Sequence, residues 1–204
     1  MNLIVAGGYA PGKFEVPSEG YDYIVAADSG YDTATNLGLV PDLVVGDFDS
    51  TGFADDLVKR GFEKLNRDKD YSDTEIALMR IKGDYDILGG GEGRVDHLFS
   101  IFSLFPRYRY PRYWFMRSDV LISLSGRYKL NLDAGDELSF FSPSGALIST
   151  DGLVWDMNET KLDLSFLSLS NRIKQKGALV DVTGNAFMRV APGVFHSGLV
   201  ERLH

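Results

Sequence analysis

The stretch Leu43-Val44-Val45-Gly46-Asp47-Phe48-Asp49-Ser50 decides the fold that this sequence predicts, because a short apolar run ends abruptly in glycine and aspartate. The same arrangement recurs at residues 3–8, 23–30 and 85–91. Such largely apolar runs, which do not alternate with polar residues, are typical of strands buried on both faces of a parallel sheet. We therefore expect a parallel sheet whose strands end in glycine or aspartate.

Helical spacing appears between these runs. Residues 98–105 carry apolar side chains at positions i, i+3, i+4 and i+7, and Pro106 follows them. Ser72 and Glu75 have the spacing of a capping box, which predicts the start of a helix that runs to Ile81. Strands that alternate with helices indicate an α/β domain.

The pattern changes after about Ser118. Short strand-like runs are now separated by Gly, Asp and Pro, at residues 120–125, 128–132, 137–141, 178–182 and 186–190. Residues 183–185 predict a hairpin between the last two runs. We expect an α/β domain at residues 1–118, with a mostly parallel sheet and flanking helices, followed by a smaller all-β sandwich domain at residues 119–204.

The composition excludes several classes of protein. A net charge of −8 argues against a nucleic-acid partner, because binding to a phosphate backbone needs a basic face. No apolar run approaches the ~20 residues that cross a bilayer, and the amino terminus does not resemble a signal peptide. Cysteine is absent, which excludes disulfides and thiolate metal sites. We expect a cytoplasmic protein with no membrane partner.

Acidic side chains follow the predicted strands at Asp28, Asp47 and Asp49, precede the predicted helix at Asp68 and Asp70, and lie in its first turn at Asp73. Ligands of open α/β sheets bind at the carboxyl ends of the strands. Carboxylates gathered there repel one another unless a cation neutralises them, and Mg²⁺ takes such oxygen ligands together with phosphates. On a continuing strand Asp47 and Asp49 share a face, and in a turn they can also converge. An Asp-x-Asp pair is equally an ordinary turn, so both interpretations stay open.

Two further segments are open to two interpretations each. Gly93-Arg94-Val95-Asp96-His97 suits either a helix start or an arginine that faces phosphate oxygens. Trp155 suits either the core of a β domain or a ring that stacks on a ligand. The sequence contains no P-loop motif, so composition and spacing alone do not identify a nucleotide site.

Six segments, taken in order, resemble the thiamine pyrophosphokinase (thiamine diphosphokinase) family over about residues 3–190. They are Ala27-Asp28-Ser29-Gly30, Gly46-Asp47-Phe48-Asp49-Ser50, Lys69-Asp70-Tyr71-Ser72-Asp73, Gly93-Arg94-Val95-Asp96-His97, Gly152-Leu153-Val154-Trp155 and Leu167-Ser168-Leu169-Ser170-Asn171. Each motif is weak alone, whereas six in this order are specific.

The resemblance implies a kinase that transfers a pyrophosphoryl group from ATP to the hydroxyl of thiamine, giving thiamine diphosphate and AMP, with Mg²⁺ as cofactor. It also implies a homodimer whose active sites lie at the subunit interface. The implied metal ligands are Asp47, Asp49 and Asp73, and Asp96 joins them as a catalytic residue. The implied ATP-binding residues are Asp28, Ser29, Gly30, Asp47, Lys69, Asp70, Gly91 and Arg94. The implied thiamine-binding residues are Asp96, His97, Trp155, Ser168, Ser170 and Asn171.

The chain departs from the family pattern in two places. Where the family often continues Asp-His-Thr-Leu-Ala-Asn, this chain has Asp96-His97-Leu98-Phe99-Ser100-Ile101, and Tyr71 replaces a small or basic residue. Two alternatives to the implied function remain. One is a metal-dependent nucleotidyl- or glycosyltransferase that uses Asp47-Phe48-Asp49, and the other is a non-catalytic sensor of nucleotide or thiamine.

Overall fold

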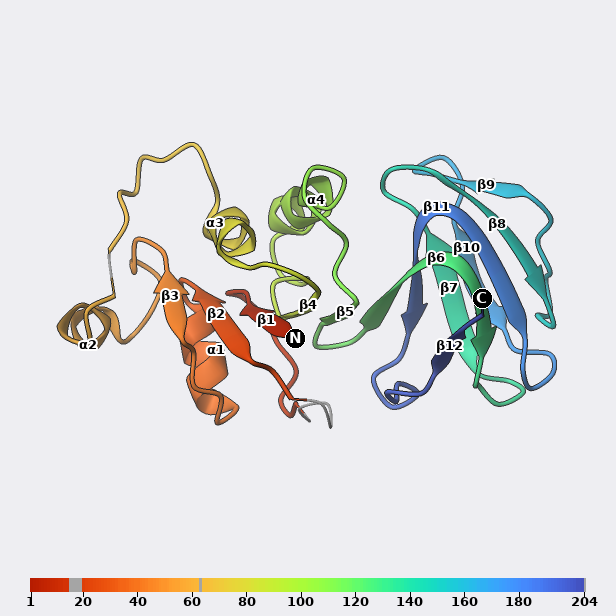
Figure 1. Ribbon diagram of the computed structural model, residues 1–204, viewed down its shortest axis with the longest axis horizontal. Coiled ribbons are helices and arrows are strands. Elements are labelled where there is room, and N and C mark those ends of the chain that lie inside the picture. Colours follow the sequence, from red (N-terminus) through yellow and green to blue (C-terminus); the bar gives the residue numbers. More distant parts are fainter. Residues whose placement is uncertain (15–19, 63, 204) are drawn as a thin grey trace. The chain divides into compact units, whose positions relative to one another are not determined.

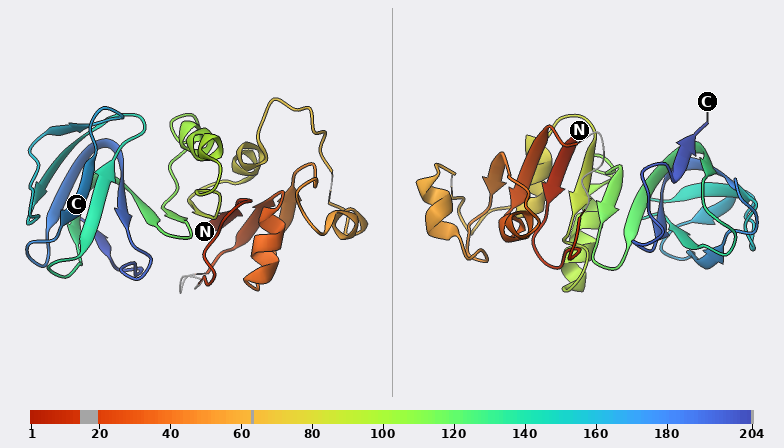
Figure 2. Two further views of the ribbon diagram at one scale, coloured as in Figure 1. Left: turned by 180° about the vertical axis from the view of Figure 1, so that it is seen from behind. Right: turned by 90° about the horizontal axis from the view of Figure 1, so that it is seen from below.

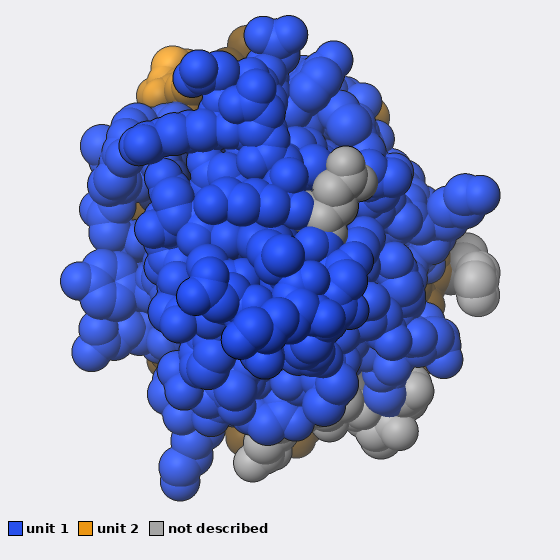
Figure 3. All heavy atoms as spheres, turned by 90° about the vertical axis from the view of Figure 1, so that its left-hand side faces the viewer, with its two compact units in different colours: residues 1–117 blue, residues 118–204 orange. Residues whose placement is uncertain are grey.

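Two units make up the chain, Met1–Arg117 and Ser118–His204, and Figure 3 colours them separately. The computed structural model describes residues 1–14, 20–62 and 64–203 (Figure 1). No helix among these described residues is long and apolar enough to cross a lipid bilayer. The division of the chain lies next to the predicted boundary after residue 118, and each unit is described below by itself.

The first unit contains a parallel sheet. Its strands are β1 (Asn2–Val5), β2 (Tyr23–Ala27), β3 (Leu43–Val45), β4 (Tyr85–Leu88) and β5 (Tyr113–Phe115). They lie in the order β5-β4-β1-β2-β3, and every adjacent pair runs parallel. Most of their side chains are buried on both faces of the sheet, which explains why the apolar runs do not alternate with polar residues.

Helices cover both faces of this sheet (Figures 1 and 2). Helix α1 (Gly30–Asn36) lies on one face, α3 (Asp73–Arg80) and α4 (Val95–Leu104) lie on the other, and α2 (Ala54–Lys59) follows β3. The predicted cap of α3 is confirmed, because the Ser72 side chain accepts a hydrogen bond from the Glu75 backbone N–H at 3.2 Å.

The second unit is built from strands. They are β6 (Val120–Leu130), β7 (Glu137–Phe141), β8 (Ala146–Asp151), β9 (Thr160–Leu162), β10 (Ser168–Arg172), β11 (Leu179–Val190) and β12 (Val200–Arg202). All regular elements within residues 118–203 are strands, and their pairings with one another are antiparallel. Strand β11 pairs with β6, β7 and β8, so it is the centre of the unit.

The predicted hairpin at residues 183–185 is wrong, because residues 179–190 form one strand with a register shift between Val182 and Ala186. Gly184 has φ +97°, which lets the strand change direction without ending. The first half of β11 therefore pairs with β8 and the second half with β7. Gly126, also at φ +97°, lies in β6, which the sequence predicted as two separate strands.

The prediction of a mostly parallel sheet needs a correction for the chain as a whole. Parallel pairing holds for β1–β5, whereas the strands of the second unit pair antiparallel. Antiparallel strands joined by short turns need no crossover helix, so the second half of the chain adds strands without helices. The α/β class describes the first unit.

Candidate active site

The carboxyl ends of four parallel strands meet at one edge of the first unit. Gly7 follows β1, Asp28 follows β2, Asp47 follows β3, and the glycine run 89–91 follows β4. Strand order reverses direction at β1, since β2 lies on one side of it and β4 on the other. Such a reversal opens a crevice where α/β proteins bind ligands.

The turns after β2 and β3 have unusual backbones. Asp28 has φ +48° and Phe48 has φ +59°, a region that non-glycine residues seldom adopt and that costs about 1–3 kcal/mol each. Phe48 is buried, which holds its turn in place. A Cβ at Gly46 would lie 3.0 Å from both Cα and Cβ of Asp28, so the two turns approach each other closely. This approach brings Asp47 beside Asp28.

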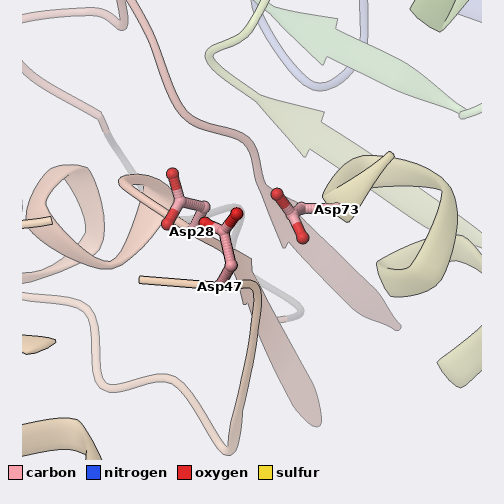
Figure 4. Close-up of side chains that lie close together, drawn as sticks. All are labelled: Asp28, Asp47 and Asp73. Atoms are coloured by element: carbon pink, nitrogen blue, oxygen red, sulfur yellow. The ribbon is translucent and has the colours of Figure 1, made fainter. Parts of the chain in front are cut away.

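Three carboxylates converge at this point (Figure 4). Asp28, Asp47 and Asp73 each offer an oxygen atom within 4.8 Å of the others. Asp73 reaches the group from the first turn of α3, whereas the other two come from the strand ends. Asp47 is only 9% exposed, and Oδ1 of Asp28 is buried with no hydrogen-bond partner among the described residues. A buried, unpartnered carboxylate oxygen within such a group fits a hard divalent cation such as Mg²⁺.

Burial changes the ionisation of two members of this cluster. It raises the pKa of Asp28, although the Ser29 backbone N–H and the Ser50 hydroxyl oppose the shift. It also raises the pKa of Asp73, against the influence of Lys69. In both cases the neighbouring aspartates raise the pKa further. A pKa raised above its unfolded value means that the ionised cluster destabilises the metal-free protein above that pKa, and a cation relieves this cost.

A pocket of about 710 Å³ opens over the cluster, and basic side chains line it. Nζ of Lys69 lies 3.2 Å from Oδ1 of Asp73, and the Lys69 side chain is 17% exposed. Arg67 and Arg94 also line the pocket and are more exposed. Carboxylates beside cations can hold a metal ion together with the phosphates of a nucleotide.

Asp49 lies outside the carboxylate cluster. Its carboxylate accepts a hydrogen bond from the Ser50 hydroxyl at 2.7 Å and lies 3.5 Å from Nη2 of Arg67. The Ser50 hydrogen bond lowers the pKa of Asp49. The structure thus brings Asp47 and Asp73 together with Asp28, while the role of Asp49 as a metal ligand stays a prediction.

The start of α4 forms another wall of the pocket, through Arg94, His97, Ser100 and Ile101. Asp96 is outside this lining and pairs with Arg94, whose Nε donates to its Oδ1 at 3.1 Å. That hydrogen bond lowers the pKa of Asp96 to about 2. Ser100 and Ile101 are two of the positions that depart from the family pattern, and Ile101 places an apolar side chain at the site.

The other predicted nucleotide residues lie in different settings. Ser29 lines the pocket, and Asp70 is exposed outside its lining. A Cβ at Gly30 would lie 2.0 Å from the Val5 carbonyl oxygen, and a Cβ at Gly91 would lie 1.8 Å from Sδ of Met116. These two glycines allow close packing around the site.

The predicted thiamine-binding residues of the second unit lie near one another, some at its surface and Asn171 buried beneath. Trp155 is 55% exposed, and Asn171 is only 1% exposed. The Asn171 side chain fixes the Trp155 backbone, since its Oδ1 accepts from the Trp155 N–H at 3.2 Å and its Nδ2 donates to the Trp155 carbonyl at 2.8 Å. Ser168 accepts from the same Nδ2 at 3.4 Å, and Ser170 has φ +50°. The core interpretation of Trp155 is therefore wrong.

Sequence reasoning missed several pocket residues, among them Gly7, Gly8, Tyr9, Ser50, Arg67, Thr74 and Glu92. Gly7 and Gly8 carry a signal, because they end the first apolar run as Asp28 and Asp47 end theirs. Arg67 and Thr74 flank the Lys69-to-Asp73 motif. Tyr9 and Glu92 carry no such signal, since only the folded chain brings their loops to the pocket.

Replacing Gly46 with alanine should displace Asp28, because the new Cβ would meet its Cα and Cβ at 3.0 Å. We expect a loss of about 1–3 kcal/mol in unfolding free energy and a fall of tenfold or more, roughly up to a hundredfold, in turnover of the substrate. Thermal unfolding and initial rates measure both. Gly52→Ala is the matched control, since its Cβ would meet nothing within 4 Å. If Gly46→Ala and Gly52→Ala showed equal stability and equal turnover, the close approach of Gly46 to Asp28 would be contradicted.

This chain is similar to one protein family in sequence and to several solved structures in fold. Residues 17–113 match the family model for the catalytic domain of thiamin pyrophosphokinase. The whole chain is similar to the crystal structure of thiamin pyrophosphokinase from Geobacillus thermodenitrificans, with 25% identity, a TM-score of 0.66 and coverage of 98% of this chain and 100% of that one. No curated protein sequence matches the chain.

Two structures of lower sequence identity share the fold. A thiamin pyrophosphokinase family protein from Enterococcus faecalis has 21% identity, a TM-score of 0.70 and coverage of 93% of this chain and 97% of that one. Thiamin pyrophosphokinase from Candida albicans has 16% identity, a TM-score of 0.68 and coverage of 93% and 88%, respectively. At these identities the likeness is one of fold.

Proposed function

We propose that this chain, whose residues 17–113 match the family model for the catalytic domain of thiamin pyrophosphokinase, is a member of that family and forms thiamine diphosphate and AMP from thiamine and ATP. The observation that carries this proposal is the carboxylate cluster of Asp28, Asp47 and Asp73 inside a pocket lined by Lys69 and Arg94. A cation-binding centre beside basic side chains is what transfer from a nucleoside triphosphate requires.

In the proposed reaction the thiamine hydroxyl oxygen forms a bond to the β-phosphorus of ATP. The bond from that phosphorus to the oxygen it shares with the α-phosphate breaks, so AMP leaves and the hydroxyl loses its proton. Asp28, Asp47 and Asp73 would hold Mg²⁺, which when bound neutralises charge on the phosphate oxygens. The pocket is also lined by Lys69, Arg67 and Arg94. Their positive charges can pair with the phosphate oxygens that the cation leaves free and so orient the triphosphate of ATP.

The proton of the hydroxyl needs an acceptor, and the two acids weighed from the sequence are Asp73 and Asp96. Asp73 lines the pocket in which the substrates would bind, so it lies within reach of the hydroxyl. Asp96 lies outside the pocket lining, and Arg94 lowers its pKa to about 2. These differences favour Asp73.

Thiamine binding is proposed for the surface around Trp155 in the second unit of a partner subunit. The thiazolium ring of thiamine is cationic and flat, which suits the face of an exposed tryptophan. The same unit exposes further apolar side chains, at Val154, Phe166, Leu167 and Leu169. An apolar surface of this kind suits cover by a second subunit, in line with the homodimer that the family resemblance implies. A reaction that consumes ATP also fits the cytoplasmic location expected from the sequence.

The proposal is tested with purified protein, ATP, Mg²⁺ and thiamine, by chromatographic separation of the products. We expect AMP and thiamine diphosphate in equal amounts, with neither formed when thiamine or Mg²⁺ is omitted. Thiamine binding without ATP consumption would identify a sensor instead. Turnover of a sugar nucleotide to a nucleoside diphosphate and a glycoside would identify the alternative transferase.

A further inference from the structure

A buried carboxylate outside the pocket lining has no part in the proposed chemistry. Glu75 is 6% exposed and lies in the first turn of α3, two residues after Asp73. A charged group is costly to bury unless partners satisfy it. The partners of Glu75 are therefore informative about what the residue does.

Both side-chain partners of Glu75 come from the segment that follows α4. The guanidinium of Arg107 forms an ion pair with Oε1 of Glu75, and the Tyr108 hydroxyl donates to the same oxygen at 2.8 Å. The Glu75 backbone N–H is held by the Ser72 cap. One side chain thus ties the start of α3 to the end of α4.

These two helices carry two sides of the pocket. The start of α3 presents Asp73 to the carboxylate cluster, and α4 supplies His97, Ser100 and Ile101 to the other wall. Catalytic and metal sites need their groups held within about 0.5 Å, and a displacement of about 1 Å costs on the order of a hundredfold in rate. The distance between the start of α3 and the wall formed by α4 should therefore affect how tightly the nucleotide binds.

We propose that Glu75 is a positioning residue, which through Arg107 and Tyr108 fixes Asp73 relative to the wall formed by α4 and so sets the affinity for magnesium-bound ATP. This inference rests on the proposed function. Glu75 itself touches no substrate, and its effect passes through the placement of α3 against α4.

The same unit holds a matched control. Asp86 on β4 is also a fully buried carboxylate, and it pairs with Nη2 of Arg112 at 2.9 Å and accepts from the Tyr21 hydroxyl at 2.8 Å. It is opposite Leu3 in the sheet, away from the carboxyl ends of the strands, and is not among the residues that line the pocket. Neutralising Asp86 disturbs a comparable buried ion pair without changing the contact between α3 and α4.

The test compares Glu75→Gln with Asp86→Asn by thermal unfolding and by calorimetric titration with MgATP in the absence of thiamine, at a temperature where both are folded. Both variants should unfold at lower temperature than the wild type. Glu75→Gln should weaken MgATP binding about tenfold or more, whereas Asp86→Asn should stay within about twofold of the wild type. In steady-state assays the KM for ATP should likewise rise in Glu75→Gln and stay close to the wild-type value in Asp86→Asn.

A milder variant keeps the inference testable if Glu75→Gln does not fold. Tyr108→Phe removes one hydrogen bond to Glu75 and leaves the ion pair, and it should weaken MgATP binding about threefold. Unchanged affinity in the Glu75 and Tyr108 variants that fold, or an equal loss in Asp86→Asn, would overturn the inference while the proposed function stands. A wild-type protein that binds no MgATP would overturn the proposed function itself.

Discussion

Replacing Asp47 with asparagine should lower AMP formation on the order of a thousandfold or more, and it should leave the metal-free protein as stable as the wild type or slightly more stable. Asp47 is nearly buried between Asp28 and Asp73, and its charge contributes to the raised pKa of both neighbours. Removing that charge relieves repulsion in the metal-free cluster, while it replaces one of the three carboxylates that would hold the cation with a neutral amide.

Differential scanning calorimetry with and without Mg²⁺ separates these two effects. For the wild type, Mg²⁺ at about ten times its dissociation constant should stabilise the fold by about 1.4 kcal/mol, which corresponds to a few degrees in Tm. Asp47→Asn should lose this gain. Asp55→Asn, an exposed acid on α2, is the control and should keep both the gain and the activity. Wild-type activity in Asp47→Asn would show that the carboxylate cluster takes no part in the reaction.

The same assay on Asp49→Asn tests the ligand role implied by the family resemblance. Asp49 is paired with Ser50 and Arg67 and lies outside the cluster. A loss as large as that of Asp47→Asn, together with a lost Mg²⁺ gain, would make Asp49 a ligand. Near-normal turnover of Asp49→Asn would indicate that Asp28, and not Asp49, is the metal ligand beside Asp47 and Asp73.

Replacing Trp155 with alanine should raise the KM for thiamine about tenfold to thirtyfold and change kcat little, because a desolvated contact between a cation and an indole ring contributes on the order of 2 kcal/mol. The Trp155 ring is half-exposed and its backbone is fixed by the buried Asn171, so truncation should cost little stability. Leu164→Ala, an exposed apolar residue of the same unit, should leave the KM unchanged. An unchanged KM in Trp155→Ala would remove this surface from the thiamine site.

Mixing two variants tests whether the site is shared between subunits. Asp47→Asn lacks the cluster in the first unit, and Trp155→Ala lacks the ring in the second. Random exchange of subunits at limiting thiamine should restore about a quarter of wild-type activity, since about half of the dimers are mixed and each holds one intact site. Mixtures no more active than the separate variants would contradict a site that two subunits share.

Much of the first unit follows from local sequence. The β-branched runs that end in glycine or aspartate predicted both the strands and the edge where Gly7, Asp28 and Asp47 meet. Ser72 predicted the start of α3, because a side chain that caps its own helix acts over three residues. Signals of this range are readable without knowledge of the fold.

Other features depend on contacts between distant segments. Asp47 and Asp49 share a face only on an extended strand, and the positive φ of Phe48, held by burial of its ring, turns the chain between them. The grouping of Asp28 with Asp73 likewise comes from packing of α3 against the sheet. Gly184 looked like part of a hairpin turn, since a glycine at a bulge and one at a turn have the same local signature.

The fate of the individual ATP phosphates shows whether a pyrophosphoryl group passes to thiamine. The purified protein is incubated with Mg²⁺, thiamine and ATP labelled at either the α- or the β-phosphorus, and the products are separated. We expect the β-label in thiamine diphosphate and the α-label in AMP, in equal amounts and only when thiamine is present. A β-label found in ADP, or ATP left intact beside thiamine, would contradict the transfer of a pyrophosphoryl group.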